Sequence, residues 1–331
     1  MVTIKDISKV CHVSVSTVSR ALNNYSDINE ETKQLILQKA NELNYIPNKA
    51  ARQLVKKITN RLAIITRTID EENLFNVLRG LYKFCETIGY EVSLHSFSSS
   101  LKQNKSYYTY CKENNIEAVL LYGIHTNDPY IKELVDKKFP TVIIDCAISS
   151  ERVTNITINN YKASYEAVAY LIKSGCKNII SIQGGHDSYV TRERVKGFKD
   201  ALIDNSINFS EKNIYYGDFT EKTGETLMSL ALKEHKKIDA VFCSSDNIAI
   251  GVYNVLNQNN LTIPKDISVI GFGDFKFCEF LSPKLSSVKQ SMYDFGYEGG
   301  KELYNMIKNK TSSNIIQLNY EIKIRESVKN I

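Results

Sequence analysis

No hydrophobic run in this 331-residue sequence is long enough to cross a membrane. A membrane-spanning helix needs about 20 consecutive apolar residues, and every apolar stretch here is far shorter. The segment 1–14 mixes acidic and basic side chains around no apolar centre, unlike a secretion signal. We therefore expect a cytoplasmic protein that has no membrane partner.

The sequence also lacks the paired cysteines of zinc sites and disulfide frameworks. Its seven cysteines are scattered, odd in number and never arranged as Cys-x-x-Cys. We interpret them as reduced thiols that are mostly buried. The sequence thus predicts no metal site and no cofactor.

Signatures of common enzyme classes are missing as well. The sequence contains no Gly-x-Ser-x-Gly elbow, no His-Glu-x-x-His motif and no Gly-x-x-x-x-Gly-Lys phosphate loop. His186 stands beside Asp187, but the preceding Gly184 and Gly185 are better explained as a turn after a strand. We therefore expect a binding protein and not an enzyme.

Positive charge is concentrated at the N-terminal end. Residues 1–58 contain nine Lys and Arg against five Asp and Glu, and so carry +4 of the net charge of +5. A basic segment on a nearly neutral remainder suggests an anionic partner such as nucleic acid.

Three short helices are predicted in this basic segment from capping residues and apolar spacing. They are Ile4–Val10 after Thr3, Val15–Leu22 after Ser14, and Glu30–Leu43 after Asn29. Thr3 with Asp6 resembles a capping box. Ile4, Ile7 and Val10 lie on one face of the first helix, and Leu35 and Ile36 follow the helical period in the third. Val18, Ala21 and Leu22 of the second helix are expected to face inward.

Two short helices joined by a tight turn, with a third packed beneath, form a helix-turn-helix unit. The second helix presents small hydroxyls, Val15 and Arg20, a surface that packs poorly but suits the major groove of DNA. Arg20 can bond a guanine edge and Val15 can touch a thymine methyl. The alternative is a helical bundle with a solvated face.

The first fifty residues resemble the DNA-binding headpiece of the lactose/galactose-repressor (LacI–GalR) family. The resemblance rests on the runs 3–7, 13–14, 17–23 and 43–48. His12 stands where the family usually has glycine, so it must adopt that backbone conformation at some cost. The headpiece residues expected to contact double-stranded DNA are Thr3, Val15, Ser16, Thr17, Ser19, Arg20 and Asn23.

Residues 48–54 are similar to the family's hinge pattern, Asn-x-x-Ala-x-x-Leu. So short a segment is marginal as a free helix, and in the family it becomes helical when two chains meet on DNA. The resemblance implies that Ala51 lets the paired hinges approach and that Leu54 wedges into the minor groove. Asn48 is the third hinge residue expected to contact DNA. The alternative interpretation of the segment is a plain linker.

From residue 60 onwards, strand-like runs alternate with helical patterns in two successive series, which predict two doubly wound parallel sheets. The expected strands are 62–65, 91–94, 118–121, 141–144, 179–182, 214–216, 240–243 and 267–271. The expected helices include 75–88, 161–174, 190–204, 221–234 and 246–259. The predicted fold class is α/β: an all-α helix-turn-helix headpiece plus a two-lobed, doubly wound domain.

This second part resembles the family's periplasmic-binding-protein-like sensor domain. The runs that carry the resemblance include 192–198, 245–251, 263–272, 285–290 and 323–327. The predicted domains are a headpiece (1–46), a hinge helix and linker (47–59), and an effector-binding and dimerisation domain (60–331). Its N-lobe is expected at about 60–158 and 288–320, and its C-lobe at 159–287 and 321–331.

Ligands of such sheets bind at the carboxyl ends of the strands, in the cleft between lobes. The resemblance makes Arg194 and Asp246 the expected main contacts, a donor fork and an acceptor pair that suit vicinal sugar hydroxyls. A surface ion pair for Arg194 and a helix N-cap for Asp246 are the alternatives. The weaker candidates are an aromatic ligand platform and three polar residues: Phe219, Asp145, Asn159 and Gln290.

Together these features predict a sequence-specific repressor of a carbohydrate-utilisation operon. We expect a homodimer on a pseudo-palindromic operator, released by a small sugar-like effector. The alternative is the same fold responding to a purine or to a protein coregulator. The acidic segment 70–75 replaces an Asn-Pro-Phe sequence of many relatives, so the ligand need not match theirs.

Overall fold

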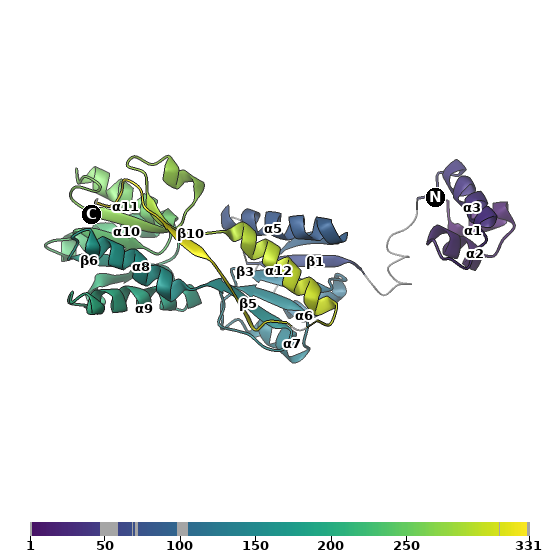
Figure 1. Cartoon of the computed structure of the whole chain (residues 1–331), viewed down its shortest axis with the longest axis horizontal. Coiled ribbons are helices and arrows are strands. Elements are labelled where there is room, and N and C mark those ends of the chain that lie inside the picture. The colour runs from purple at the N-terminus through teal and green to yellow at the C-terminus, as the bar shows by residue number, and fades with distance from the viewer. Residues whose placement is uncertain are drawn as a thin grey trace. The chain divides into compact units, whose positions relative to one another are not determined.

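The computed structural model describes residues 2–46, 59–67, 69, 72–97, 105–310 and 312–329. The chain divides into two compact units, Met1–Thr59 and Asn60–Ile331, which we call the headpiece and the body. Each is described by itself (Figure 1). The predicted hinge contacts Asn48, Ala51 and Leu54 lie outside the described residues.

The headpiece contains the three predicted helices. They are α1 (Ile4–Cys11), α2 (Val15–Leu22) and α3 (Glu30–Glu42). The predicted caps are confirmed: Thr3 and Asp6 form a capping box, the Ser14 hydroxyl accepts from the Thr17 amide at 3.0 Å, and the Asn29 side chain accepts from the Glu31 amide at 2.8 Å.

One residue from each helix anchors the headpiece core. Ile7, Val18 and Ile36 have no exposed surface. Val10 and Leu35 follow the apolar spacing of their helices but are 47% and 43% exposed. The helical period turns their neighbours inward instead, Cys11 in α1 and Ile36 in α3.

The turn between α1 and α2 confirms the expectation for His12. This residue has φ 51° and ψ 37°, in the left-handed region, and its amide donates to the end of α1. A β-carbon is strained in that region, which is why glycine is the usual choice there.

The body contains two six-stranded sheets. Sheet A has the order β11-β5-β4-β3-β1-β2, and sheet B the order β12-β10-β9-β8-β6-β7. Sheet A is built from β1 (Arg61–Thr66), β2 (Glu91–Ser96), β3 (Ala118–Tyr122), β4 (Thr141–Ile144), β5 (Val153–Ile158) and β11 (Ile315–Leu318). Sheet B is built from β6 (Ile179–Gln183), β7 (Ile214–Tyr216), β8 (Ala240–Cys243), β9 (Ser268–Gly273), β10 (Ser286–Gln290) and β12 (Tyr320–Lys323).

The pairing is that of two doubly wound parallel sheets, as predicted. Among the described strands, the pair of β10 with β12 is antiparallel and the others are parallel. All eight predicted strands are present, whereas β5, β10, β11 and β12 were not predicted.

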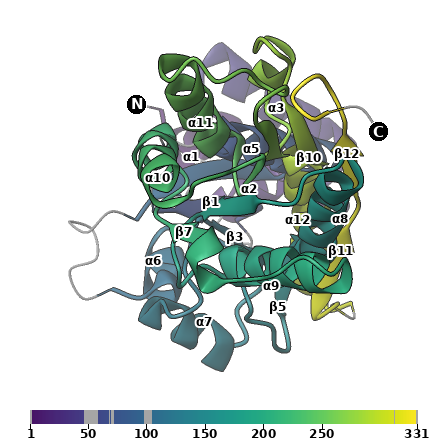
Figure 2. The same cartoon turned by 90° about the vertical axis from the view of Figure 1, so that its left-hand side faces the viewer.

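Helices cover both faces of sheet B. Helices α8 (Asn160–Lys173) and α9 (Tyr189–Asp204) pack on one face, and α10 (Glu221–Glu234) and α11 (Asp246–Gln258) on the other (Figure 2). The four are the helices predicted for this region. A hydrophobic core lies on each face of sheet B. Phe198 of α9 and Phe242 of β8 belong to the core beneath α8 and α9, and Val252 of α11 belongs to the core beneath α10 and α11.

On sheet A, α5 (Glu72–Ile88) and α12 (Met292–Ile307) lie side by side over one face (Figure 1). Their backbones touch, because a β-carbon on Gly80 or Gly296 would collide with main-chain atoms of the other helix. The remaining short helices are α6 (Tyr107–Glu113), α7 (Lys132–Asp136), and the 3-10 turns η1 (Pro129–Ile131), η2 (Glu211–Asn213) and η3 (Lys276–Glu279).

In the described part of the body, the chain passes between the two sheets three times. It passes from β5 to α8, from β10 to α12, and from β11 to β12. The predicted lobe boundary at 287/288 falls inside β10, which stays paired with sheet B through Gln290. The predicted boundary at 320/321 falls one residue inside β12.

All seven cysteines are buried and unpaired, which confirms the prediction for them. No group of three or more His, Cys, Asp or Glu that could hold a metal occurs among the described residues. Among the helices within the described ranges, none combines the length and hydrophobicity needed to cross a membrane.

Candidate DNA-binding surface and ligand cleft

The outer face of α2 carries the predicted base-reading side chains. Val15 is 37% exposed, and Ser16 and Arg20 are exposed as well, while Val18 and Ala21 point into the core. The alternation follows the helical period, since the inward positions are three or four residues apart. The structure thus leaves one face of α2 free for an external partner.

Several of the other predicted DNA contacts also hold the headpiece together. The Thr3 hydroxyl donates to Asp6 at 2.8 Å as part of the α1 capping box. The Thr17 hydroxyl bonds Ser14 at 2.8 Å, and the Asn23 amide donates to the Ser19 carbonyl at 2.7 Å. These bonds fix the ends of α1 and α2 and so the orientation of the exposed face.

An ion pair that the sequence analysis missed holds Arg20. Its Nη1 donates to Oδ2 of Asp27 at 2.7 Å, and the two side chains are 57% and 51% exposed. The other guanidinium nitrogens have no acceptor in the described part of the headpiece. The pair therefore leaves Arg20 a free edge that is suited to a base or a phosphate.

In the body, Arg194 of α9 is buried at the carboxyl end of sheet B, with 4% exposure. Its Nε donates to Asn160 at 2.9 Å and its Nη1 to the Ser244 carbonyl at 2.6 Å. The guanidinium carbon lies 3.6 Å from the centre of the Phe272 ring. A surface ion pair, the alternative for this residue, is incompatible with such burial.

Burial lowers the pKa of Arg194 to about 10, and the nearby carboxylates of Asp145 and Asp246 oppose that shift. The side chain therefore stays charged at neutral pH. No acceptor for Nη2 is found among the residues that the structure describes. A buried charge with one unused donor favours an external oxygen atom at that position.

Asp246 is fully buried at the first turn of α11, and both of its oxygens are used within the protein. Oδ1 accepts from the Ser287 hydroxyl at 2.6 Å and Oδ2 from the Phe275 amide at 2.9 Å. Ser245, and not Asp246, is the N-cap of α11. Burial raises the pKa of Asp246 to about 6. The carboxylate thus ties α11 to β10 and to the loop after β9.

A partly buried ion pair lies beside Asp246. Arg325 contacts Asp274 at 2.7 Å, and the two side chains are 14% and 9% exposed. The Asp274 amide in turn donates to the Ser287 hydroxyl, 3.0 Å away. This network fastens the segment after β12 to the end of β9.

Asp145 lies at the end of β4, on the N-lobe side. It has a φ of 53°, and its Oδ1 accepts from the Thr157 hydroxyl at 2.6 Å. Burial raises its pKa, while the Thr157 bond and the charge of Arg194 oppose the rise. Asp145 and Arg194 therefore face each other across the two lobes at electrostatic range.

Asn159 is the N-cap of α8, where its side chain accepts from the Lys162 amide at 2.9 Å. The next residue, Asn160, is the one that contacts Arg194. The sequence analysis missed Asn160, although the first residue after a cap is a natural position for a side chain that faces the sheet edge.

Phe219 and Gln290 also lie at strand ends. The half-buried Phe219 ring rests against Gly184, at a position where any larger residue would collide with it. Gln290 ends β10 with a buried Oε1 that lacks a partner in the described chain. A second glutamine, Gln183 at the end of β6, also has an Oε1 without a partner in the described chain, and it has no exposed surface.

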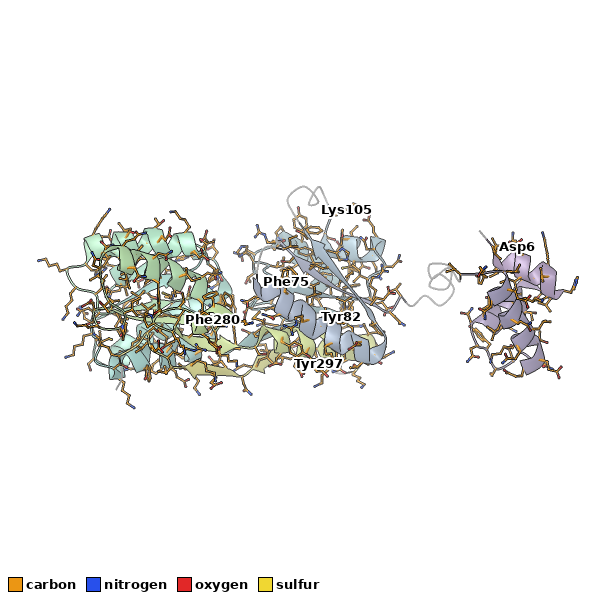
Figure 3. The ribbon with its side chains drawn as sticks, turned by 90° about the horizontal axis from the view of Figure 1, so that it is seen from above. Asp6, Phe75, Tyr82, Lys105, Phe280 and Tyr297 are labelled. Atoms are coloured by element: carbon orange, nitrogen blue, oxygen red, sulfur yellow. The ribbon has the colours of Figure 1, made fainter. Side chains whose placement is uncertain are left out.

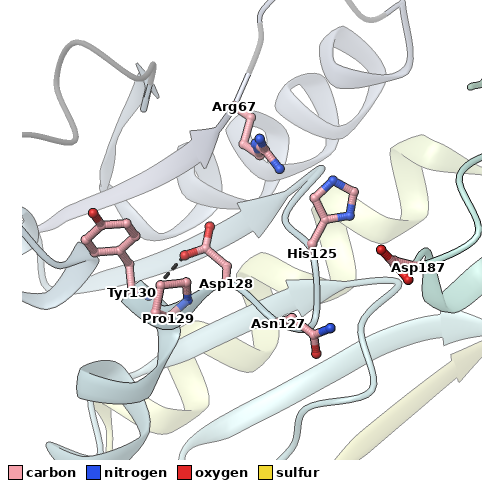
Figure 4. A pocket seen from close by; sticks show the side chains of 7 residues that line it. All are labelled: Arg67, His125, Asn127, Asp128, Pro129, Tyr130 and Asp187. Atoms are coloured by element: carbon pink, nitrogen blue, oxygen red, sulfur yellow. Dashed lines mark hydrogen bonds between the residues drawn. The ribbon is translucent and has the colours of Figure 1, made fainter.

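A pocket of about 320 Å³ opens between loops of both lobes (Figure 4). Arg67 follows β1, a run from His125 to Tyr130 follows β3, and Asp187 follows β6. Its lining residues are Arg67, His125, Asn127, Asp128, Pro129, Tyr130 and Asp187. None of them was a predicted ligand contact. Their position directly after buried strands is the signal that could have identified them.

Both units of the chain match known protein families. Residues 3–48 match the model for bacterial regulatory proteins of the lacI family, and residues 168–328 match a periplasmic binding protein-like domain. The transcriptional regulator RegA of Clostridium acetobutylicum is 34% identical over 99% of both chains. The probable transcriptional repressor ExuR of Bacillus subtilis is 32% identical over 100% of this chain and 99% of its own.

Two solved structures share the fold. A Lac repressor dimer bound to operator and the anti-inducer ONPF superposes with a TM-score of 0.85 at 21% identity, over 98% of each chain. A complex of the transcriptional regulator CelR with cellobiose gives a TM-score of 0.76 at 24% identity, over 99% of this chain and 100% of CelR. At these identities the likeness confirms the predicted architecture: helix-turn-helix headpiece and two-lobed body.

Proposed function

Since this chain belongs to the lacI family of bacterial regulatory proteins, it is a DNA-binding transcription regulator and not an enzyme, and we propose that it is a repressor controlled by a sugar-like ligand. The repressed genes would form a carbohydrate-utilisation operon, as predicted from the sequence. We place the protein in the cytoplasm, where its operator DNA lies.

The outer face of α2 supports the proposed mode of DNA binding. Val15, Ser16 and Arg20 are exposed together and would read base edges in the major groove. Thr3, Thr17, Ser19 and Asn23 would contact the phosphates around them. The roles of Asn48, Ala51 and Leu54 in the minor groove rest on the family resemblance.

Exposed aromatic side chains on the body support the proposed homodimer. Phe75 and Tyr82 of α5 are 58% and 59% exposed, and Phe280, just past η3, is 74% exposed (Figure 3). Large apolar side chains are rarely left in water unless a partner covers them. A two-fold dimer would present two α2 helices to a pseudo-palindromic operator.

The observation that carries the ligand proposal is the buried Arg194 with its unused donor. A sugar hydroxyl can accept a hydrogen bond from this guanidinium and donate one to Asp145 or Gln290. Phe219 offers an apolar surface for the sugar ring at the edge of the same cleft. A ligand held by both lobes shifts the population towards the lobe arrangement that binds it better.

The test is a thermal-shift screen of the full chain against sugars, sugar phosphates and purines, followed by operator binding with each hit. A ligand at 100 times its Kd stabilises a fold by about 2.7 kcal/mol, which raises Tm by about 5 °C in a domain of this size. A sugar that raises Tm and releases operator supports the proposal.

The variant Arg194→Lys keeps the charge but loses the planar fork, and should abolish both responses. Arg192→Lys makes the same change at an exposed position of the same helix and should respond as the wild type does. A purine hit, or a response that survives Arg194→Lys, would replace this proposal with the purine alternative or with another site. A panel without any hit would favour a protein coregulator.

A further inference from the structure

The N-lobe wall of the pocket between the loops after β1, β3 and β6 carries three polar side chains that can donate hydrogen bonds. Arg67 is exposed at its wall, and its guanidinium has no acceptor among the described residues. The side chains of His125 and Asn127, also exposed, have no side-chain partner within the same set. Figure 4 shows these three side chains coming from two different loops of the N-lobe.

Two carboxylates also line the pocket, and within the described part of the chain neither is paired with those donors. Both oxygens of Asp128 are used inside the N-lobe, since Oδ1 accepts from the Tyr130 amide at 3.0 Å and Oδ2 from the Tyr107 hydroxyl at 2.9 Å. Asp187 is the other carboxylate that lines the pocket, and its side chain is 89% exposed on the opposite lobe. Among the described residues, neither Asp128 nor Asp187 forms a hydrogen bond or ion pair with the Arg67 guanidinium, so its donors are available to a ligand.

An arginine fork binds two oxygens of one carboxylate or phosphate with parallel hydrogen bonds. Two neighbouring sugar hydroxyls can also accept from the fork, but they are neutral, whereas hydrogen bonds from a guanidinium to a carboxylate or phosphate are charge-assisted and stronger. His125 and Asn127 lie along the same wall and add N–H donors. The side of the pocket that Arg67 lines thus matches an oxyanion better than it matches a neutral sugar ring.

We propose that the effector is a sugar that carries an oxyanion, either a carboxylate or a phosphate, and that Arg67 and His125 bind this group. The inference rests on the proposed function, in which the effector lies between the lobes. The oxyanion would anchor the ligand to the N-lobe, and Asp187 would accept from a ring hydroxyl on the C-lobe. The ligand's charge would therefore decide which sugars the repressor detects.

The experiment measures binding of matched sugars to the full chain by titration calorimetry. The pairs are D-galacturonate with D-galactose and D-glucuronate with D-glucose, and glucose 6-phosphate tests the phosphate source. We expect at least one anionic member to bind about tenfold or more tightly than its neutral partner, because hydrogen bonds to charged groups are the stronger ones. Added salt should reduce this preference.

Two variants locate the preference. Arg67→Gln should weaken binding of the preferred anion by about 10- to 100-fold and leave binding of the neutral sugar unchanged. Arg67→Lys keeps the charge but not the fork, so its affinity for the anion should lie between those of the wild type and Arg67→Gln. Lys132→Gln removes one positive charge from an exposed residue outside the pocket lining, and should bind like the wild type.

The outcomes separate this inference from the proposed function. If a neutral sugar binds as tightly as its acid and still releases operator, the effector cleft stands and the oxyanion is wrong. If Arg67→Gln binds the anion like the wild type, Arg67 is not its site. If no sugar of either class binds while operator binding is intact, both the sugar effector and this inference are overturned.

Discussion

At the scale of single residues, the DNA-reading surface depends on how Arg20 is held. Its ion pair with Asp27 is about half exposed on both sides, and such pairs contribute only about 0–1 kcal/mol to stability. The pair matters more for orientation, because a tethered guanidinium loses less freedom when it meets a base. We therefore expect Asp27 to influence which base Arg20 selects.

We predict that Arg20→Ala reduces operator affinity by about 1–3 kcal/mol and removes the base preference at the contacted position. Asp27→Asn keeps the arginine and removes its ion pair, so it should widen the base preference and reduce operator affinity by less than Arg20→Ala does. Binding to a library of operator variants measures both. Unchanged specificity in Arg20→Ala would show that another residue reads this base.

Asp246 gives a prediction about pH. Its pKa is raised by burial to about 6, above the ordinary value near 4. A carboxyl with a raised pKa holds its proton more tightly in the folded state. Acidification from about pH 7 to about pH 4 should therefore stabilise the wild type relative to Asp246→Asn, by about 1–3 kcal/mol.

Urea unfolding of both proteins across that pH range measures the difference. The free energy of unfolding of the wild type minus that of Asp246→Asn should increase as the carboxyl becomes protonated. If their stabilities change with pH in parallel, Asp246 is not the titrating group.

The residue scale also shows where sequence reasoning ends. The resemblance identified Arg194, but its partners Asn160 and Phe272 come from elements far away in sequence. Asp246 was expected to face the ligand, yet its carboxylate turns to Ser287 and the Phe275 amide. Which way a buried side chain turns depends on contacts that no local pattern contains.

At the scale of elements, the predicted strands are those with continuous apolar runs, such as β3 and β4. The strand β5 reads Val-Thr-Asn-Ile-Thr-Ile and is wholly buried, so its polar residues concealed it. The strands β11 and β12 are four residues long and partly exposed, and they are recognised as strands only because they pair with β5 and β10. Such pairing between distant segments leaves little local signal.

The contact between α5 and α12 makes an element-scale prediction. A methyl group on Gly296 would collide with the Val77 carbonyl of α5, so Gly296→Ala should destabilise the body by about 1–3 kcal/mol. In Gly185→Ala the nearest atom to the new carbon is 3.9 Å away, the Gly217 oxygen. That control should unfold like the wild type, and equal stability of all three proteins would contradict the close helix contact.

At the scale of the whole molecule, dimerisation decides whether two headpieces reach one operator. We predict that Tyr82→Asp lowers dimer affinity and weakens operator binding, because it places a charge on the exposed aromatic face of α5. Leu230→Asp changes an apolar residue of α10 that is 41% exposed, and should leave both unchanged. Sedimentation and operator titration measure the two effects, and a fully dimeric Tyr82→Asp would move the interface elsewhere.

The three passages of the chain between the sheets have a consequence for synthesis on the ribosome. The headpiece has a hydrophobic core of its own and is complete once its three helices have emerged. Sheet A, by contrast, receives α12 and β11 only after the whole of β6 to β10 has been made, and sheet B receives β12 later still. A nascent chain halted before residue 292 would thus carry a finished DNA-reading unit ahead of two lobes that each still lack a strand.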